Sequence, residues 1–173
     1  MLYTTGTKKA VLAEQKGKHM AKCYQLIGVP ASGKTTWIRN QEWAKDCSQI
    51  STDMWVEMEA ERQGKTYSEV FEEYMPQAVK LMAANVESAR AMGLDIIWDQ
   101  TSTTETSRAR KFNMLPDYEH IAVVFKTPEL KELHRRLASR PGKAIPAQVM
   151  VQMIKGFQMP TLEEGFREIW YAD

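Results

Sequence analysis

Residues 28–35 of the sequence, Gly-Val-Pro-Ala-Ser-Gly-Lys-Thr, match the phosphate-binding pattern G-x-x-x-x-G-K-[ST] without interruption. The two glycines remove the Cβ atoms that would keep the backbone from closing around an anion, so successive N–H groups can converge on phosphate oxygens. We expect Lys34 to reach the terminal phosphates and the Thr35 hydroxyl to bind Mg²⁺. A glycine-rich turn with a chance Lys-Thr pair is the alternative. The pattern predicts a nucleoside triphosphate site formed by Gly28, Ala31, Ser32, Gly33, Lys34, Thr35 and Thr36.

A second candidate group, Asp53, follows the brief strand-like run at residues 47–50. In open α/β sheets, ligand-binding groups project from the carboxyl ends of strands. A carboxylate that faces the γ-phosphate of a nucleotide is the group with which a kinase accepts a hydroxyl proton. The alternative is that Asp53 only caps the helix that begins at Met54. Trp55 is a candidate surface for stacking a base, with core packing as the alternative.

The clearest predicted strand covers residues 94–99, in which the apolar residues 96–98 are followed by Asp99. An apolar strand that ends in aspartate is the Walker B arrangement, in which the carboxylate holds Mg²⁺ directly or through water. A simple turn residue is the alternative. The polar loop at residues 100–104 follows at the same edge of the predicted sheet and is suited to helix caps and phosphate contacts, with Thr101 as the candidate substrate contact.

A basic helix is predicted over residues 129–138, and a Pro-Gly pair at 141–142 separates it from a further helix that begins after Pro146. Arginines on a hinged pair of helices close a lid over the transferred phosphate in many small P-loop kinases. We therefore expect a lid near residues 131–146 that carries Arg136 and Arg140, with an ordinary solvated helix face as the alternative. For Arg108 and Arg110 the sequence leaves surface and phosphate-binding roles equally open.

Four apolar runs alternate with helical segments, which predicts an α/β fold with a parallel sheet covered on both faces and right-handed crossovers. We expect a P-loop NTPase-type sheet of four to five strands with a helical lid. Pro76 predicts a kink or a boundary between two helices. The aromatic segment at residues 160–173 is interpreted as a docked terminal helix.

The 173 residues fit one domain, and no stretch approaches the roughly 18 apolar residues of a membrane span. Cys23 and Cys47 are interpreted as buried free thiols, which fits a reducing cytosol. Residues 1–22 hold five lysines and one glutamate, which leaves 18 basic against 21 acidic side chains in the rest. We expect residues 1–21 to form a flexible basic arm, either solvated or in contact with phosphates, and 22–173 to form a mildly acidic kinase domain that does not bind nucleic acid by net charge.

Together these motifs occur in the order seen in phage-type polynucleotide 5′-hydroxyl kinases. The chain resembles the kinase domain of that family over residues 22 to about 160. The resemblance rests on residues 28–37, 50–53 and 96–99, and on Arg136-x-x-x-Arg140 followed by Lys143-Ala144-Ile145-Pro146. The last of these sequences is the most particular to the family.

The resemblance implies transfer of the γ-phosphoryl group of ATP, with Mg²⁺, to a nucleic-acid hydroxyl, most often the 5′-OH of DNA or RNA. By the same resemblance Asp53 is the general base, Lys34 and Thr35 bind phosphates and Mg²⁺, and Asp99 matches the aspartate that ends the third strand. Arg136 and Arg140 become lid arginines, with Arg140 nearest the transferred phosphate. The resemblance also implies that a nucleic-acid 5′ end is the partner and that the protein acts in nucleic acid repair. It further implies a location in the host cytoplasm of a phage.

Two departures from the family pattern keep the acceptor open. The family carries an arginine that grips the acceptor phosphate three residues after its base, and this chain has Val56 there. The phosphatase domain of bifunctional members is not expected in this sequence. A small-molecule or modified-nucleoside hydroxyl is therefore the alternative acceptor, and a non-kinase NTP-binding module is the second alternative, although no Asn-Lys-x-Asp guanine signature occurs. The oligomeric state stays open.

Overall fold

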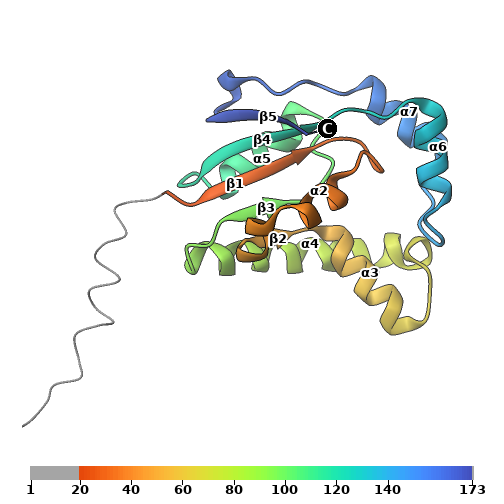
Figure 1. Cartoon of the computed structure of the whole chain (residues 1–173). Coiled ribbons are helices and arrows are strands. Elements are labelled where there is room, and N and C mark those ends of the chain that lie inside the picture. Colours follow the sequence, from red (N-terminus) through yellow and green to blue (C-terminus); the bar gives the residue numbers. More distant parts are fainter. Residues whose placement is uncertain (1–19, 173) are drawn as a thin grey trace, which may run out of the picture.

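The computed structural model describes residues 20–172, so nearly all of the predicted basic arm lies outside the described residues. The centre of the fold is a five-stranded sheet with the strand order β2-β3-β1-β4-β5 (Figure 1). Every neighbouring pair of strands is parallel, which confirms the predicted P-loop kinase-like α/β class. The strands are β1 (Lys22–Ile27), β2 (Ser48–Ile50), β3 (Ile96–Trp98), β4 (Glu119–Phe125) and β5 (Glu168–Ala172).

Helical segments connect the strands and cover both faces of the sheet (Figure 1). They are α2 (Lys34–Asn40), η1 (Glu42–Asp46), α3 (Thr52–Gln63), α4 (Tyr67–Ala91), α5 (Glu105–Met114), α6 (Leu130–Ala138), α7 (Ala147–Lys155) and η2 (Leu162–Glu164). Within residues 20–172, no helix has the length and apolar character needed to cross a membrane.

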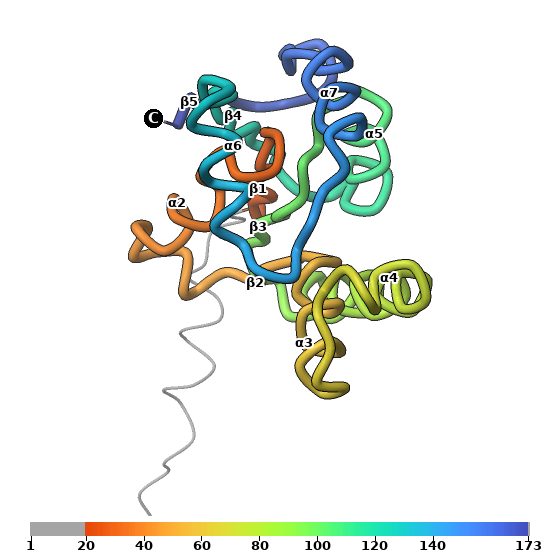
Figure 2. The backbone as a smooth tube through the Cα atoms, turned by 90° about the vertical axis from the view of Figure 1, so that its right-hand side faces the viewer, coloured from red at the N-terminus to blue at the C-terminus, as the bar shows by residue number. Residues whose placement is uncertain are grey.

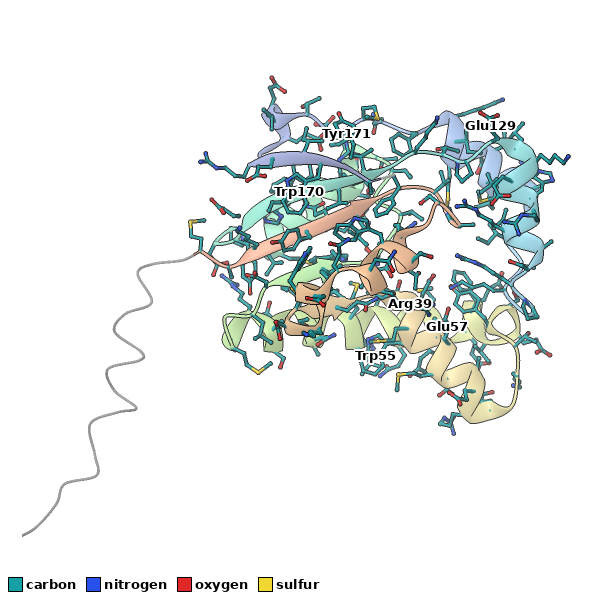
Figure 3. All side chains as sticks on the ribbon, in the orientation of Figure 1. Arg39, Trp55, Glu57, Glu129, Trp170 and Tyr171 are labelled. Carbon is teal, nitrogen blue, oxygen red and sulfur yellow. The ribbon has the colours of Figure 1, made fainter. Side chains whose placement is uncertain are left out.

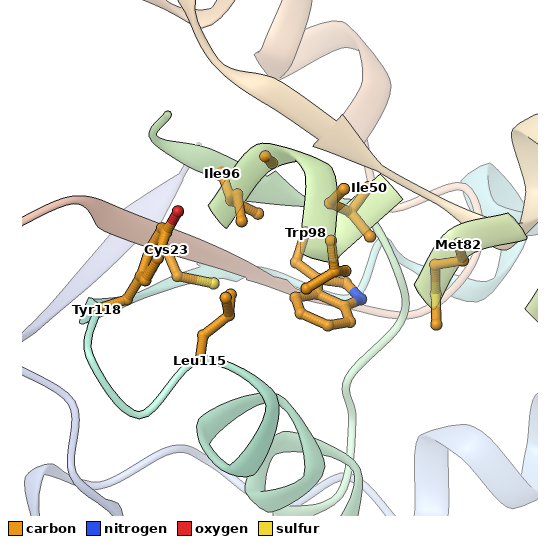
Figure 4. Packing of buried hydrophobic residues seen from close by; sticks show 9 residues of the cluster. Cys23, Ile50, Met82, Ile96, Trp98, Leu115 and Tyr118 are labelled. Atoms are coloured by element: carbon orange, nitrogen blue, oxygen red, sulfur yellow. The ribbon is translucent and has the colours of Figure 1, made fainter. Parts of the chain in front are cut away.

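The two faces of the sheet follow from the alternation of side chains along each strand. Cys23 of β1 belongs to a buried cluster with Trp98 of β3 and Met82 of α4 (Figure 4). Its neighbour Tyr24 belongs to a different cluster, which contains Ile38 of α2. Helix α4 therefore packs on one face of the sheet and α2 on the other.

Helices α3 and α4 form a hairpin that extends beyond the sheet (Figures 1 and 2). Its own small core contains Val56, Ala60, Val70 and Ala78. The boundary predicted at Pro76 is wrong, because α4 continues through this residue. Pro76 is exposed, and buried side chains of α4 on both sides of it keep the helix packed.

Helices α6 and α7 pack against the loop that follows β1. Leu133 of α6 and Met150 of α7 are buried in one cluster with Val29 and Ala31 of that loop. The segment between the two helices runs past the carboxyl edge of the sheet toward α3 and α4 (Figure 2). The helices predicted over residues 129–138 and after Pro146 are therefore present, and both contact the phosphate-loop segment directly.

The terminal helix predicted from residues 160–173 is wrong, because the chain forms η2 and then β5. Strand β5 pairs in parallel with β4, and Ile169 lies opposite Ala122 while Trp170 lies opposite Val123. Ile169 and Trp170 pack into clusters on opposite faces of the sheet. An apolar run this short does not distinguish a strand from a helix by its period.

Candidate active site

The loop at residues 28–35 begins where β1 ends, and its first residue has to be glycine. A Cβ atom on Gly28 would lie 2.6 Å from Ser32 Oγ and 2.8 Å from Phe125 Cβ, closer than van der Waals contact allows. The Gly28 N–H donates a 2.9 Å hydrogen bond to the carbonyl of Thr101. The loop is therefore held tightly between β4 and the polar loop that follows β3.

The backbone of this loop turns through two left-handed residues, Ala31 with φ 63° and Gly33 with φ 107°. Such a conformation brings successive backbone N–H groups toward one point, which suits an anion. Among the described residues, Ser32 Oγ is buried and has no hydrogen-bond partner. A phosphate oxygen would satisfy it, so the loop fits the predicted nucleotide.

The lysine of the motif lies against the loop backbone. Lys34 Nζ donates hydrogen bonds of 2.8 Å to the Gly28 carbonyl and 2.9 Å to the Val29 carbonyl. Burial lowers the pKa of Lys34 to about 8, and the nearby carboxylates of Asp99 and Asp53 oppose that shift. At this edge of the sheet, both predicted aspartates are thus close enough to Lys34 for their charges to act on its pKa.

A cavity of about 700 Å³ opens beside the phosphate loop. One wall is the loop and the start of α2, and the opposite wall is α6 with the segment that follows it. The predicted site residues that line it are Ala31, Ser32, Gly33, Thr35, Thr36, Arg136 and Arg140. The cavity therefore joins most of the predicted nucleotide-binding residues to both lid arginines, whereas Asp53 and Asp99 lie outside its lining.

The two lid arginines differ in their contacts. Arg136 Nη1 donates to the Ala31 carbonyl at 3.2 Å, and its Nε forms a 2.6 Å ion pair with Glu132. Arg140 is exposed and lines the cavity, and its charge contributes to the lowered pKa of Lys34. Both arginines thus line the cavity, one bonded to the loop backbone and the other exposed to solvent.

Asp53 lies in the first turn of α3, directly after the carboxyl end of β2. Ser51 caps that helix by accepting a 3.4 Å hydrogen bond from the Met54 N–H, so Asp53 is not needed as the cap. The Asp53 carboxylate instead accepts a 2.9 Å hydrogen bond from the Tyr67 hydroxyl and forms a 2.8 Å ion pair with Lys143 Nζ. Its side chain remains 51% exposed, so a substrate can approach it.

Asp99 follows β3, and its N–H donates to the Ile50 carbonyl of β2 at 2.8 Å. Its Oδ2 accepts a 3.3 Å hydrogen bond from Gln49 Nε2. Burial raises the pKa of Asp99, while the charge of Lys34 acts in the opposite direction. The carboxylate is therefore partly desolvated and close to the lysine of the phosphate loop.

The donor set fits Mg²⁺ bound together with a nucleotide. No group of three or more His, Cys, Asp or Glu in residues 20–172 could hold a metal alone. Mg²⁺ needs fewer protein ligands, because it usually binds one or two carboxylates together with substrate phosphates and water. Thr35 and Asp99 are the oxygen ligands that this chain would supply.

Two residues close to Asp53 in the sequence, Trp55 and Val56, pack in the interior. Val56 is fully buried in the core of the α3–α4 hairpin. Trp55 packs against that core and against the cluster under the sheet, and its indole N–H is buried without a partner among the described residues. Figure 3 shows Trp55 and Glu57 leaving α3 in different directions. These contacts favour the packing interpretation of Trp55.

Thr101, the candidate substrate contact of the loop after β3, is half-buried, and its backbone carbonyl accepts the hydrogen bond from Gly28. The neighbouring Ser102 adopts a left-handed conformation with φ 48°. Arg108 is fully buried and bonded to Glu164, whereas Arg110 is exposed. The loop is thus held by buried contacts, and Arg108 is a structural residue.

Sequence reasoning missed Tyr67 and the specific role of Lys143 as partners of Asp53. Tyr67 lies 14 residues and Lys143 lies 90 residues from Asp53 along the chain. Burial and the Asp53 charge raise the pKa of Tyr67, so its hydroxyl stays a donor at ordinary pH. The only sequence feature that pointed to Lys143 was the Lys143-Ala144-Ile145-Pro146 sequence. That sequence predicts a lid, but it does not indicate which residue Lys143 contacts.

The sequence model of a protein family described as "AAA domain" matches residues 24–160. The chain belongs to this AAA-domain family. The phosphate-loop sequence, Asp53, Asp99 and the predicted lid residues 131–146 all lie within the part of this AAA-domain protein that the model matches.

Solved structures share the fold of this AAA-domain protein. A candidate kinase from Chloroflexus aurantiacus is 18% identical with a TM-score of 0.69, covering 91% of this chain and 87% of its own. A chain of the PezAT chromosomal toxin–antitoxin system of Streptococcus pneumoniae is 20% identical with a TM-score of 0.65, covering 99% of this chain and 78% of its own. A chain of the Pnkp1/Rnl/Hen1 RNA repair complex is 21% identical with a TM-score of 0.60, covering 83% of this chain and 46% of its own. At these identities the similarity is one of fold, the α/β P-loop kinase-like fold.

Proposed function

We propose that this AAA-domain protein transfers the γ-phosphoryl group of ATP to a hydroxyl group, with Asp53 as the general base. The observation that carries the proposal is the placement of Asp53. Its carboxylate lies at the carboxyl end of β2, is half exposed, and is held by Tyr67 and Lys143 close enough to the phosphate loop to act on the pKa of Lys34. A module that only binds a nucleotide has no need of such a carboxylate.

In the proposed reaction the backbone amides of the phosphate loop and Lys34 bind the β- and γ-phosphates of ATP. The acceptor oxygen forms a bond to the γ-phosphorus, the bond from that phosphorus to the β–γ bridging oxygen breaks, and the hydroxyl proton passes to Asp53. Arg136 and Arg140 approach the phosphates from the lid side of the cavity. Mg²⁺, held by Thr35 and Asp99, would neutralise phosphate charge when bound.

The 5′-hydroxyl of DNA or RNA is the acceptor that we propose first. The order of motifs along the chain supports it, as does the fold shared with a chain of an RNA repair complex. A nucleic-acid 5′ end is then the partner, and repair in the cytoplasm of a phage host is the context that the motif resemblance supports.

A second acceptor class, the hydroxyl of a small molecule or a modified nucleoside, is favoured by one observation. Val56, at the position where the resembled family has its phosphate-gripping arginine, is 0% exposed and lies within the α3–α4 core. Among the described residues, the only basic side chain paired with Asp53 is Lys143, and Glu57 shares it. An acceptor without a phosphate would not need that arginine.

Transfer of labelled γ-phosphate from ATP tests both acceptor classes in one experiment. The acceptors are a 5′-hydroxyl oligonucleotide, the same oligonucleotide with a blocked 5′ end, and free nucleosides. Label on the free 5′ end alone supports a polynucleotide kinase. Label on nucleosides, or on the oligonucleotide with its 5′ end blocked, supports the second class. Nucleotide binding without transfer to any acceptor would overturn the proposal and favour an NTP-binding module.

A further inference from the structure

The segment between α6 and α7 contacts the proposed base through Lys143. Lys143 Nζ lies 2.8 Å from Asp53 Oδ2 and 2.8 Å from Glu57 Oε1. It also lies 4.2 Å from the centre of the Tyr67 ring, which attracts a cation. The Lys143 side chain is only 16% exposed, so these groups surround it on several sides.

Hydrogen bonds on both sides of Lys143 attach the same segment to the start of α4. The Ser68 N–H donates to the Gly142 carbonyl at 3.0 Å, and the Ala144 N–H donates to Ser68 Oγ at 3.0 Å. A Cβ atom on Gly142 would lie 2.9 Å from the Thr66 side chain. The lid segment therefore lies directly on the helix hairpin that carries Asp53, as Figure 2 shows for the backbone.

Helix α6, which leads into this segment, faces the nucleotide cavity. Arg136 donates to the Ala31 carbonyl of the phosphate loop, and Arg140 lines the cavity. One short stretch of chain thus contacts the phosphate loop at Arg136 and the proposed base at Lys143. Closure of such a lid over the nucleotide can therefore change the position of the groups on the acceptor side of the site.

We propose that Lys143 is a positioning residue for phosphoryl transfer, which fixes the Asp53 carboxylate when the lid rests on the α3–α4 hairpin. The inference rests on the proposed function and adds a coupling between lid closure and orientation of the base. Tyr67 holds the second carboxylate oxygen at 2.9 Å. Each carboxylate oxygen has two acceptor positions, so the held carboxylate can still accept the hydroxyl proton.

Three variants separate positioning from packing. Lys143→Gln removes the charge, Lys143→Arg restores a cation, and Lys155→Gln changes an exposed lysine of α7 as a matched control. We expect Lys143→Gln to lower kcat by about tenfold to a hundredfold with little change in the KM for ATP, because a small misplacement of a reacting group has effects of that order. Lys143→Arg should recover most of the rate, and Lys155→Gln should match the wild type.

Hydrogen exchange of the Ser68 and Ala144 amides measures seating of the lid without any need for activity. Lys143→Gln should speed exchange at both amides, while Lys143→Arg and Lys155→Gln should not. A variant Tyr67→Phe keeps the ring and loses the hydroxyl, so it should lower kcat several-fold with unchanged exchange.

A wild-type kcat in Lys143→Gln would overturn the positioning role, whether or not exchange changes. Faster exchange in Lys143→Gln, in a protein that transfers phosphate to no acceptor, would overturn the proposed function and leave the lid contact standing. The two failures are therefore distinguishable.

Discussion

Arg108 and Glu164 form a two-point ion pair in the interior, with Nε–Oε2 and Nη2–Oε1 distances of 2.7 Å each. The Arg108 side chain is 0% exposed and that of Glu164 is 8% exposed. The remaining nitrogen, Nη1, donates to the carbonyls of Ser102 at 3.1 Å and Gln158 at 2.9 Å. This one side chain therefore joins the polar loop of the candidate site to the segment that leads into β5.

Arg108→Met should destabilise the protein by about 3–5 kcal/mol, because it leaves the Glu164 carboxylate buried without its cation. Chemical denaturation measures this change in the free energy of unfolding. Arg110→Met, on the same helix but exposed, is the matched control and should change stability by less than about 0.5 kcal/mol. Equal stability of the two variants would show that the buried pair does not hold the loop.

Nucleotide affinity should fall as the pH rises above about 8, the value to which burial lowers the pKa of Lys34. Below that pH the lysine is already charged in the free protein. Above it, binding to phosphates requires uptake of a proton, so the affinity falls by up to about tenfold per pH unit until the pKa of the complex is reached. Calorimetric titration of ATP at several pH values between 7.5 and 9.5 measures the slope. A Lys34→Met variant should bind weakly and without this slope; a flat profile in the wild type would contradict the prediction.

Val56→Arg should not create the site at which the arginine of the resembled kinases binds the acceptor phosphate. Val56 is fully buried between α3 and α4, so an arginine there places an unpaired charge in the core. We expect a loss of more than about 3 kcal/mol in the free energy of unfolding, against less than about 0.5 kcal/mol for Met58→Arg on the exposed face. A stable Val56→Arg variant with a lower KM for a phosphate-bearing acceptor would mean that position 56 faces the substrate.

The sequence was sufficient for the parts of the site that depend on neighbours along the chain. The phosphate loop follows a strand and enters a helix, and Asp53 and Asp99 each follow a strand that ends at the same edge. Parallel pairing brings those ends together, so local pattern and fold class together predict that these residues lie at this edge of the sheet.

Local sequence patterns could not predict contacts between segments that are far apart in the chain. The pairing of Lys143 with Asp53 and the burial of Arg108 depend on how the lid and the C-terminal segment dock, which no periodicity records. The error at Pro76 has the opposite cause, because packing along α4 outweighs a strong local preference. Strand β5 was missed because five residues are too few to distinguish the two-residue repeat of a strand from the 3.6-residue repeat of a helix.

Single-turnover transfer from labelled ATP by Asp53→Asn tests whether Asp53 accepts the proton of the acceptor hydroxyl. The acceptor is the 5′-hydroxyl oligonucleotide or, if that takes no label, the nucleoside that does, and ATP affinity is measured in parallel. We predict that the rate of transfer falls by about 10²–10⁴-fold while ATP affinity stays close to that of the wild type. Transfer by Asp53→Asn at the wild-type rate would show that Asp53 is not the general base.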